Sequence, residues 1–199
     1  MDAKAWDERY TGTELVWSAD PNRFVAEQTG DLPPGRALDL AAGEGRNSIW
    51  LAKRGWRVTA VDFSAAALAK AKLLSDAQDV AVDWVTADLL TWRPEPGAYD
   101  LVLIAYLHLP EAEIAAVLAN AAAAVAPGGT FLLVGHDLDN LEHGVGGPQD
   151  PDILHTPDRV SAALGAGLRV ERAERVRRPV TVEGEAREAI DTLVRAVRP

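Results

Sequence analysis

The chain has 199 residues, 48% of them hydrophobic, and a formal net charge of −10 at pH 7. This length suits a single domain with a full-sized core. The acidic balance argues against a protein that tracks nucleic-acid phosphates, and the absence of cysteine excludes disulfides, thiolate metal ligands and a cysteine nucleophile.

The N-terminal region lacks the features of a signal peptide. Residues 1–10 are charged, and no apolar run in the chain reaches the roughly 20 residues that a membrane-spanning helix needs. We therefore expect a soluble, cytoplasmic protein with no membrane partner. Residues 1–35 favour two short helices, around residues 5–10 and from Pro21-Asn22 to about Thr29, and then a turn at residues 31–35.

A glycine turn between two short apolar strands is the most informative segment. A strand is predicted at residues 37–40, a turn at Gly43 and Gly45, a helix at about residues 47–54, and a strand at residues 58–61 that ends in Asp62. Glycine lets a ligand approach the backbone, and the start of a helix offers N–H donors. An acid such as Asp62 can accept both hydroxyls of a ribose, so the pattern predicts a nucleoside-binding βαβ unit.

The residues around this turn discriminate between nucleoside cofactors. The dinucleotide fingerprint needs a third glycine, and Ser48 stands in its place. Two carboxylates, Asp39 and Glu44, would also repel a pyrophosphate. They are compatible with a cofactor that carries an ammonium and a sulfonium, so an NAD(P)-dependent oxidoreductase is the weaker alternative.

The following elements continue an alternating α/β pattern. Ser64 is expected to cap a helix over residues 65–74, and a third strand is predicted over residues 83–88. The apolar run at residues 99–110 is typical of a buried parallel strand. A long alanine-rich helix should run from residue 111 to about residue 126, where Pro127-Gly128-Gly129 would end it before a fifth strand.

The C-terminal third contains a long loop and two ambiguous segments. Residues 136–156 are predicted to form a loop of 21 residues, which is usually functional or disordered at this length. A helix is expected over residues 158–164 and a strand over residues 170–182, whose five arginines between residues 169 and 178 favour a solvated strand face. Residues 187–198 fit a helical pattern as well as a strand.

The quoted motifs resemble those of class I S-adenosylmethionine (SAM) methyltransferases. Residues 37–62 are similar to the family's first two motifs, and GEGRNSIWLA at residues 43–52 is most similar to the tellurite-resistance and thiopurine methyltransferase-like branch. The resemblance covers residues 36–137. It implies an α/β, Rossmann-like seven-stranded sheet of order 3-2-1-4-5-7-6 with helices on both faces. Strand 7 would be antiparallel, which favours a strand for residues 187–198.

The resemblance also implies a domain plan and a cofactor site. One methyltransferase domain would span residues 1–199, with a helical lid at residues 1–35, a SAM-binding core at residues 36–137, and a substrate loop and C-terminal strands at residues 138–199. Asp39 would lie near the methionine end of SAM, Asp62 would bind the ribose, and Asp88 and the backbone N–H of Leu89 would bind the adenine. The full set of implied cofactor residues is Trp17, Asp39, Gly43, Gly45, Asp62, Phe63, Asp88, Leu89 and Ala105. Whether Trp17 and Tyr10 form a lid or simply pack stays open.

The histidines are the candidates for acceptor chemistry. All four (His108, His136, His143 and His155) are expected beyond the carboxyl ends of the strands, where ligands of open α/β sheets bind. We take His108 and His136 as the candidate general bases for an O–H or N–H acceptor, with a pocket-lining role as the alternative. No tight ligand spacing supports a metal site. Arg46 could reach Glu44 or an anionic substrate, and an ion pair is its simpler role.

The resemblance implies a SAM-dependent methyltransferase of a small molecule. Its acceptor would be an S, Se, Te, O or N nucleophile, and neither nucleic acid nor protein is expected as substrate because the chain has no basic face. A SAM-binding or scaffold protein without turnover is the main alternative. A monomer or a homodimer would both fit.

Overall fold

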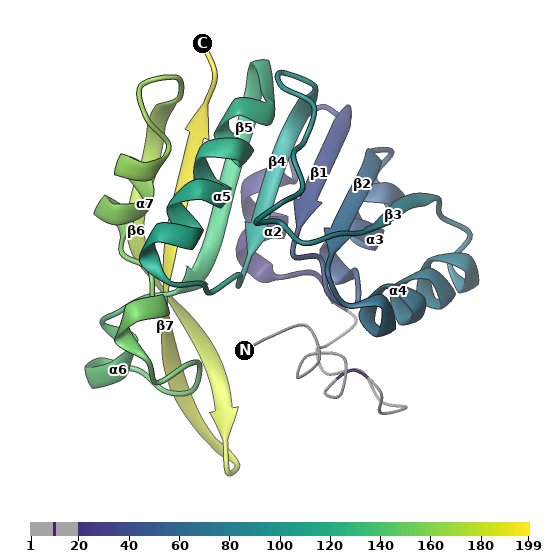
Figure 1. The fold of residues 1–199 in the computed structure, drawn as a ribbon. Coiled ribbons are helices and arrows are strands. Elements are labelled where there is room, and N and C mark those ends of the chain that lie inside the picture. Colours follow the sequence, from purple (N-terminus) through teal and green to yellow (C-terminus); the bar gives the residue numbers. More distant parts are fainter. Residues whose placement is uncertain (1–9, 11–19) are drawn as a thin grey trace.

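The computed structural model describes Tyr10 and residues 20–199. In Figure 1 these residues form one twisted sheet of seven strands in the order β3-β2-β1-β4-β5-β7-β6. Five strands are parallel: β1 (Arg36–Leu40), β2 (Arg57–Asp62), β3 (Val82–Thr86), β4 (Tyr99–Ala105) and β5 (Val125–His136). The predicted fold class and strand order are confirmed.

The C-terminal segment is a strand. β7 (Glu185–Val197) is antiparallel to β5 and to β6 (Arg169–Val182), so it closes the order predicted from the resemblance. Buried positions fill its second half from Ala189 to Val194 without alternation, because β5 and β6 flank this half and the sheet is covered there. Because the buried positions follow one another without alternation, the apolar residues among them fit a helical spacing equally well.

Side-chain caps fix where several helices begin. The Asn22 side chain accepts hydrogen bonds from the first N–H groups of α2 (Arg23–Thr29), Ser64 caps α4 (Ala65–Ala77), and Thr156 caps α7 (Pro157–Ala163). The other helices are α3 (Arg46–Lys53), α5 (Glu111–Ala124), α6 (Asn140–His143) and the 3-10 turn η1 (Pro151–Ile153).

The core lies on both faces of the sheet. One cluster joins α5 and α7 to side chains such as Ile104 and Phe131, and in Figure 1 these two helices lie in front of the sheet. The other cluster joins α2 and α3 to side chains such as Leu103 and Leu132, which alternate with the first set along β4 and β5. Strands buried on both sides explain the uninterrupted apolar runs in the sequence.

Three predicted boundaries differ in the structure. The alanine-rich helix ends at Ala124, before Pro127-Gly128-Gly129, because β5 already pairs with β4 at Val125. β3 ends at Thr86, so Asp88 lies in the turn beyond it. The predicted loop of residues 136–156 contains α6 and η1 and a bridge between Asp137 and His155, so its backbone groups are partly satisfied by local structure.

The carboxyl ends of the parallel strands meet at one edge of the sheet, the lower edge in Figure 1. The β6–β7 hairpin extends past the sheet on the same side, and α6 lies beside it. The glycine turn, Asp62, and the residues that follow β4 and β5 therefore converge at this edge, where ligands of open α/β sheets bind.

Candidate active site

The glycine turn is built around the carboxylate of Asp62. Asp62 is 8% exposed at the end of β2, and its two oxygens accept hydrogen bonds from the backbone N–H groups of Gly43 (2.8 Å) and Ser64 (2.9 Å). The same side chain thus fixes the turn after β1 and the start of α4. Asp62 therefore holds the backbone on both sides of the edge at which the glycine turn lies.

The two glycines serve the turn in different ways. Both have positive φ, 55° at Gly43 and 77° at Gly45, which disfavours any side chain. A Cβ on Gly45 would lie 2.4 Å from the ring of Trp84 on β3, so this glycine allows close packing inside the protein. A Cβ on Gly43 would lie 3.1 Å from the hydroxyl of Tyr10, which places the buried Tyr10 side chain beside the turn.

Asp39 is a buried acid with an unused oxygen. It is 1% exposed on β1, and its Oδ2 accepts a hydrogen bond of 2.6 Å from the hydroxyl of Ser48 on α3. Its Oδ1 is buried and has no partner among the described residues. Burial, with a smaller contribution from the negative charge of Asp62, raises the pKa of Asp39 to about 7. Such a group would gain from a cationic ligand.

The other predicted cofactor residues lie along the same edge. Asp88 is exposed in the turn after β3, where its Oδ1 accepts from the N–H of Leu90, and Leu89 is buried in the core cluster of α5. Phe63 directly follows β2 and Ala105 ends β4, and both are partly buried. Trp17 lies outside the described residues.

Charged side chains beside the turn have defined neighbours. Glu44 is 4% exposed and forms an ion pair of 3.1 Å with Lys70 of α4. Arg46, at the start of α3, is partly buried, and this burial lowers its pKa despite the negative charge of Asp39, which acts in the opposite direction.

Three of the four histidines lie together. The His108 ring lies 5.3 Å from that of His136 and 5.1 Å from that of His155, and both pairs are stacked. Burial first, and then the two neighbouring imidazoles, hold the pKa of His108 well below its usual value. His143 does not join this cluster: it is exposed on α6, with its Nδ1 3.3 Å from Asp139 Oδ1.

The hydrogen bonds of the cluster assign its ring nitrogens. His108 Nε2 accepts from the backbone N–H of His136 at 3.1 Å, so this nitrogen carries no proton. His155 Nε2 lies 2.8 Å from the carbonyl oxygen of Leu107, so this nitrogen carries one. Within the described part of the chain, no group of three or more His, Cys, Asp or Glu side chains is arranged to hold a metal ion.

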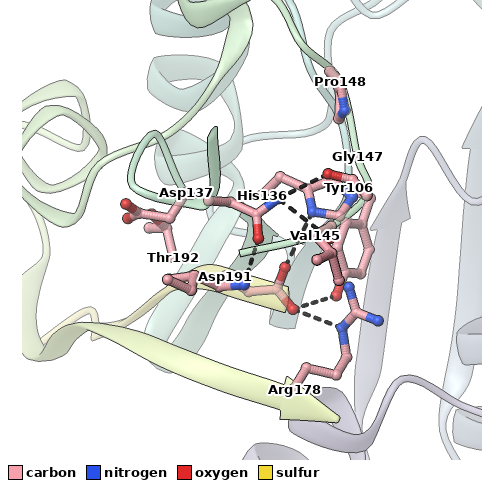
Figure 2. A network of polar contacts seen from close by, with 12 residues as sticks. Tyr106, His136, Asp137, Val145, Gly147, Pro148, Arg178, Asp191 and Thr192 are labelled. Atoms are coloured by element: carbon pink, nitrogen blue, oxygen red, sulfur yellow. Dashed lines mark hydrogen bonds and ion pairs between the residues drawn. The ribbon is translucent and has the colours of Figure 1, made fainter. Parts of the chain in front are cut away.

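A polar network that the sequence analysis missed lies beside His136 (Figure 2). Asp191 is fully buried on β7, and its Oδ2 accepts from the Tyr106 hydroxyl at 2.7 Å and from Arg178 Nε at 2.8 Å. Its Oδ1 lies 3.3 Å from His136 Nδ1. The available signal was an acid within a mostly apolar stretch, Ala189 to Val194.

Comparison with known proteins assigns this arrangement to a family. Residues 37–129, which contain the glycine turn, Asp62 and most of the parallel sheet, match the family model described as "Methyltransferase domain". This segment, a little under half of the chain, is similar to a methyltransferase domain, in line with the resemblance of the sequence to class I SAM methyltransferases. A curated relative, the ubiquinone biosynthesis O-methyltransferase of Burkholderia thailandensis, is 37% identical over 102 residues, which are 49% of this chain and 43% of the relative. The chain spans about half the length of the curated relatives that it matches.

Solved methyltransferase structures share the fold over almost the whole chain. TehB from Haemophilus influenzae matches with a TM-score of 0.73 at 16% identity, covering 99% of this chain and 67% of TehB. Magnesium protoporphyrin IX methyltransferase from Synechocystis PCC 6803 with bound SAM matches with a TM-score of 0.63 at 18% identity, covering 99% of this chain and 79% of that chain.

The residues of this methyltransferase domain fit SAM. The Oδ1 of Asp39, which has no partner among the described residues, offers an acceptor for an ammonium, and Asp62 is an acid at the end of β2, the position of the ribose-binding acid in the family that the sequence resembles. The acids near the turn that would repel a pyrophosphate attract the positive charges of SAM. SAM is thus the cofactor that both the family and the side chains indicate. No helix in the described ranges has the length and apolarity to cross a membrane.

Proposed function

We propose that this protein transfers the methyl group of SAM to a small-molecule nucleophile. The observation that carries the proposal is the buried Oδ1 of Asp39, which has no partner and lies next to the glycine turn at the carboxyl edge of the sheet. In this proposal Asp39 binds the ammonium of SAM, Asp62 binds the ribose hydroxyls, and Asp88 and the N–H of Leu89 bind the adenine. Gly43, Gly45, Phe63 and Ala105 line the cofactor, and Tyr10 lies beside it at the glycine turn.

The transfer itself is an in-line displacement at the methyl carbon. The protein must align the nucleophile with the methyl group, exclude water, and remove a proton where the acceptor carries one. His136, the last residue of β5, is covered by the backbone of Gly147: a Cβ on Gly147 would lie 2.9 Å from atoms of the His136 ring. In this proposal the segment between β5 and α7 helps to exclude water from the acceptor at His136.

Of the two histidines predicted as bases, we propose His136. His108 uses Nε2 to accept from the backbone and has a strongly lowered pKa, so it suits a supporting role. His136 directs Nδ1 toward Asp191, and its side chain is 14% exposed. Its Nε2 is therefore the ring nitrogen that remains for the acceptor.

The relatives and the charge of the chain bear on the acceptor class. The curated relative is named as an O-methyltransferase, which supports a hydroxyl acceptor. A thiol or a selenium or tellurium oxyanion would need less help from a base, in line with the tellurite-resistance resemblance. The formal net charge of −10 disfavours a nucleic-acid substrate.

A screen with methyl-labelled SAM tests the proposed function. The purified chain would be incubated with phenols, amines, thiols and selenium or tellurium oxyanions, and the products would be identified by mass. We expect label in at least one product and none with the Asp62→Ala variant. SAM binding without transfer to any acceptor in the panel would instead support a SAM-binding protein without turnover.

A further inference from the structure

Asp191 and His136 are brought together by the backbone itself. They are direct partners in the antiparallel pairing of β5 with β7, so their side chains leave the sheet side by side. Asp191 Oδ1 and His136 Nδ1 are 3.3 Å apart, and both atoms are buried with no hydrogen-bond partner among the described residues. Within the described part of the chain, the contact between these two atoms is thus the polar interaction that each of them makes.

The second oxygen of Asp191 is held by two donors. The Tyr106 hydroxyl donates at 2.7 Å from the end of β4, and Arg178 Nε donates at 2.8 Å from β6. The Arg178 guanidinium also lies over the Tyr106 ring, 5.6 Å from its centre, and Asn22 Nδ2 donates to the Tyr106 hydroxyl at 3.2 Å. The Asp191 carboxylate is thus held directly from the end of β4 and from β6, and indirectly, through Tyr106, from the N-cap of α2.

The protonation states in this network are well defined. Burial and the charge of Asp191 raise the pKa of Tyr106, so the phenol stays protonated and donates. Burial alone would raise the pKa of Asp191, but its contacts with His136, Arg178 and Tyr106 outweigh it and lower that pKa below its usual value. Asp191 is therefore a fixed anion that faces His136 Nδ1.

We propose that Asp191 is a positioning residue that keeps the proton of neutral His136 on Nδ1 and leaves Nε2 free to accept a proton from a hydroxyl or amine acceptor. The inference rests on the proposed methyl transfer and narrows its acceptor to one that is neutral before it reacts. The gap of 3.3 Å is long for a hydrogen bond, and such contacts in ligand-free sites commonly shorten when substrate binds.

The chemistry of this step balances without another reactant. The acceptor oxygen or nitrogen forms a bond to the methyl carbon while the bond from that carbon to the sulfonium sulfur breaks, and the sulfur keeps the electron pair. The proton of the acceptor moves to His136 Nε2 and later to water. Asp191 keeps its charge throughout and stabilises the imidazolium that forms.

The first test reads the tautomer of His136 directly. Nitrogen chemical shifts of the full-length protein labelled with ¹⁵N-histidine tell whether the neutral ring carries its proton on Nδ1 or Nε2. We expect the proton on Nδ1 in the wild type and a shift toward Nε2 in Asp191→Asn, whose side-chain amide can donate to Nδ1. A proton on Nε2 in the wild type would overturn the proposal, whether or not methyl transfer has been detected.

The second test separates positioning from stability. With a phenol that is neutral at pH 7.5 as the acceptor, Asp191→Asn should lower kcat by about 10²-fold with little change in SAM affinity. The same change in a His136→Ala background should cost nothing more, because the two residues act as a unit. Independent losses that multiply would overturn the proposal.

A matched control lies nearby. Asp137 is also fully buried, and it binds the Thr192 hydroxyl, Arg175 Nε and the Asp139 N–H instead of an imidazole. Asp137→Asn should lower the melting temperature but leave the kcat and the His136 tautomer near their wild-type values. Tyr106→Phe, which keeps the carboxylate but removes one donor, should shift kcat in the same direction as Asp191→Asn by a smaller factor. If wild type methylates no acceptor at all, the proposed function fails, while the tautomer still tests the Asp191–His136 pair.

Discussion

At the residue scale, the cofactor end of the proposed site centres on two neighbouring carboxylates, Asp39 and Asp62. Both positions and their order relative to the glycines could be predicted from the sequence, because each follows directly from a strand end or strand face in the βαβ pattern. The sequence could not predict that Asp39 would be left with an unpartnered oxygen, since that depends on Ser48 reaching only one side of the carboxylate.

The raised pKa of Asp39, about 7, makes cofactor affinity depend on pH. In the free protein, the folded state keeps the Asp39 carboxyl protonated up to about pH 7, whereas the unfolded state loses this proton near pH 3.8. The contribution of Asp39 to the free energy of unfolding therefore falls as the pH rises between these two pKa values. SAM should favour the ionised form, so its affinity should rise from pH 5.5 to pH 7, at most tenfold per unit. Calorimetry at several pH values checks this trend.

The variant Asp39→Asn supplies the control for that prediction. It keeps the shape of the side chain and an acceptor for Ser48 but removes the charge. Its affinity for SAM should be lower at pH 7 and nearly constant between pH 5.5 and pH 7. A wild-type affinity that does not change over this range would contradict a role for Asp39 beside the ammonium.

Asp62→Ala should abolish tight SAM binding. Without the carboxylate, the ribose of SAM would lose two charge-assisted hydrogen bonds, each worth roughly 1.5–3 kcal/mol. This loss should weaken SAM binding by about two orders of magnitude or more. Because Asp62 also holds the N–H groups of Gly43 and Ser64, the melting temperature should fall as well. A folded variant with wild-type SAM affinity would rule out the ribose assignment.

At the element scale, the segment from α6 to η1 is tied to β7 by the Asn140 side chain and by a backbone hydrogen bond of 3.1 Å from Val145 N–H to the Glu188 carbonyl. Asn140 is 2% exposed, its Oδ1 accepts from the Ile190 N–H at 2.7 Å, and its Nδ2 donates to the Gly146 carbonyl at 2.8 Å. The sequence predicted only a long loop here, since it contains few apolar residues. The short helix is stabilised by these long-range contacts, which a local pattern does not reveal.

Asn140→Ala should loosen this segment over the active site. Loss of these hydrogen bonds leaves a buried N–H without a partner, at a cost of about 1–3 kcal/mol. Limited proteolysis of the free variant should cut faster between residues 144 and 150 than in wild type, and cofactor plus acceptor should protect both proteins. Identical cutting with and without ligands would argue that the segment does not close over the site.

The element boundaries show where local sequence patterns succeed. Asn22, Ser64 and Thr156 cap helices near the predicted positions because an N-cap hydrogen bond is local. The end of α5 was misplaced by about two residues, because pairing of Val125 with Tyr99 of β4 decides it and that contact is distant in sequence.

At the scale of the whole molecule, the site exists because the sheet brings distant residues to one edge. Asp39 and Asp62 come from the first half of the chain, whereas His136, Arg178 and Asp191 come from the second half. The first group carries a motif that can be recognised in sequence. The second group depends on the strand order and on the register of β5 with β7, so only the structure reveals it.

The carboxyl edge of the parallel strands is expected to bind SAM rather than a dinucleotide. Titration calorimetry of the wild-type protein with SAM, S-adenosylhomocysteine and NADH, side by side at pH 7.5, tests it most directly. We expect saturable binding of SAM and S-adenosylhomocysteine, lost in Asp62→Ala, and no saturable binding of NADH. Saturable binding of NADH, with no heat from SAM or S-adenosylhomocysteine, would show that this edge binds a dinucleotide and would rule out the proposed SAM site.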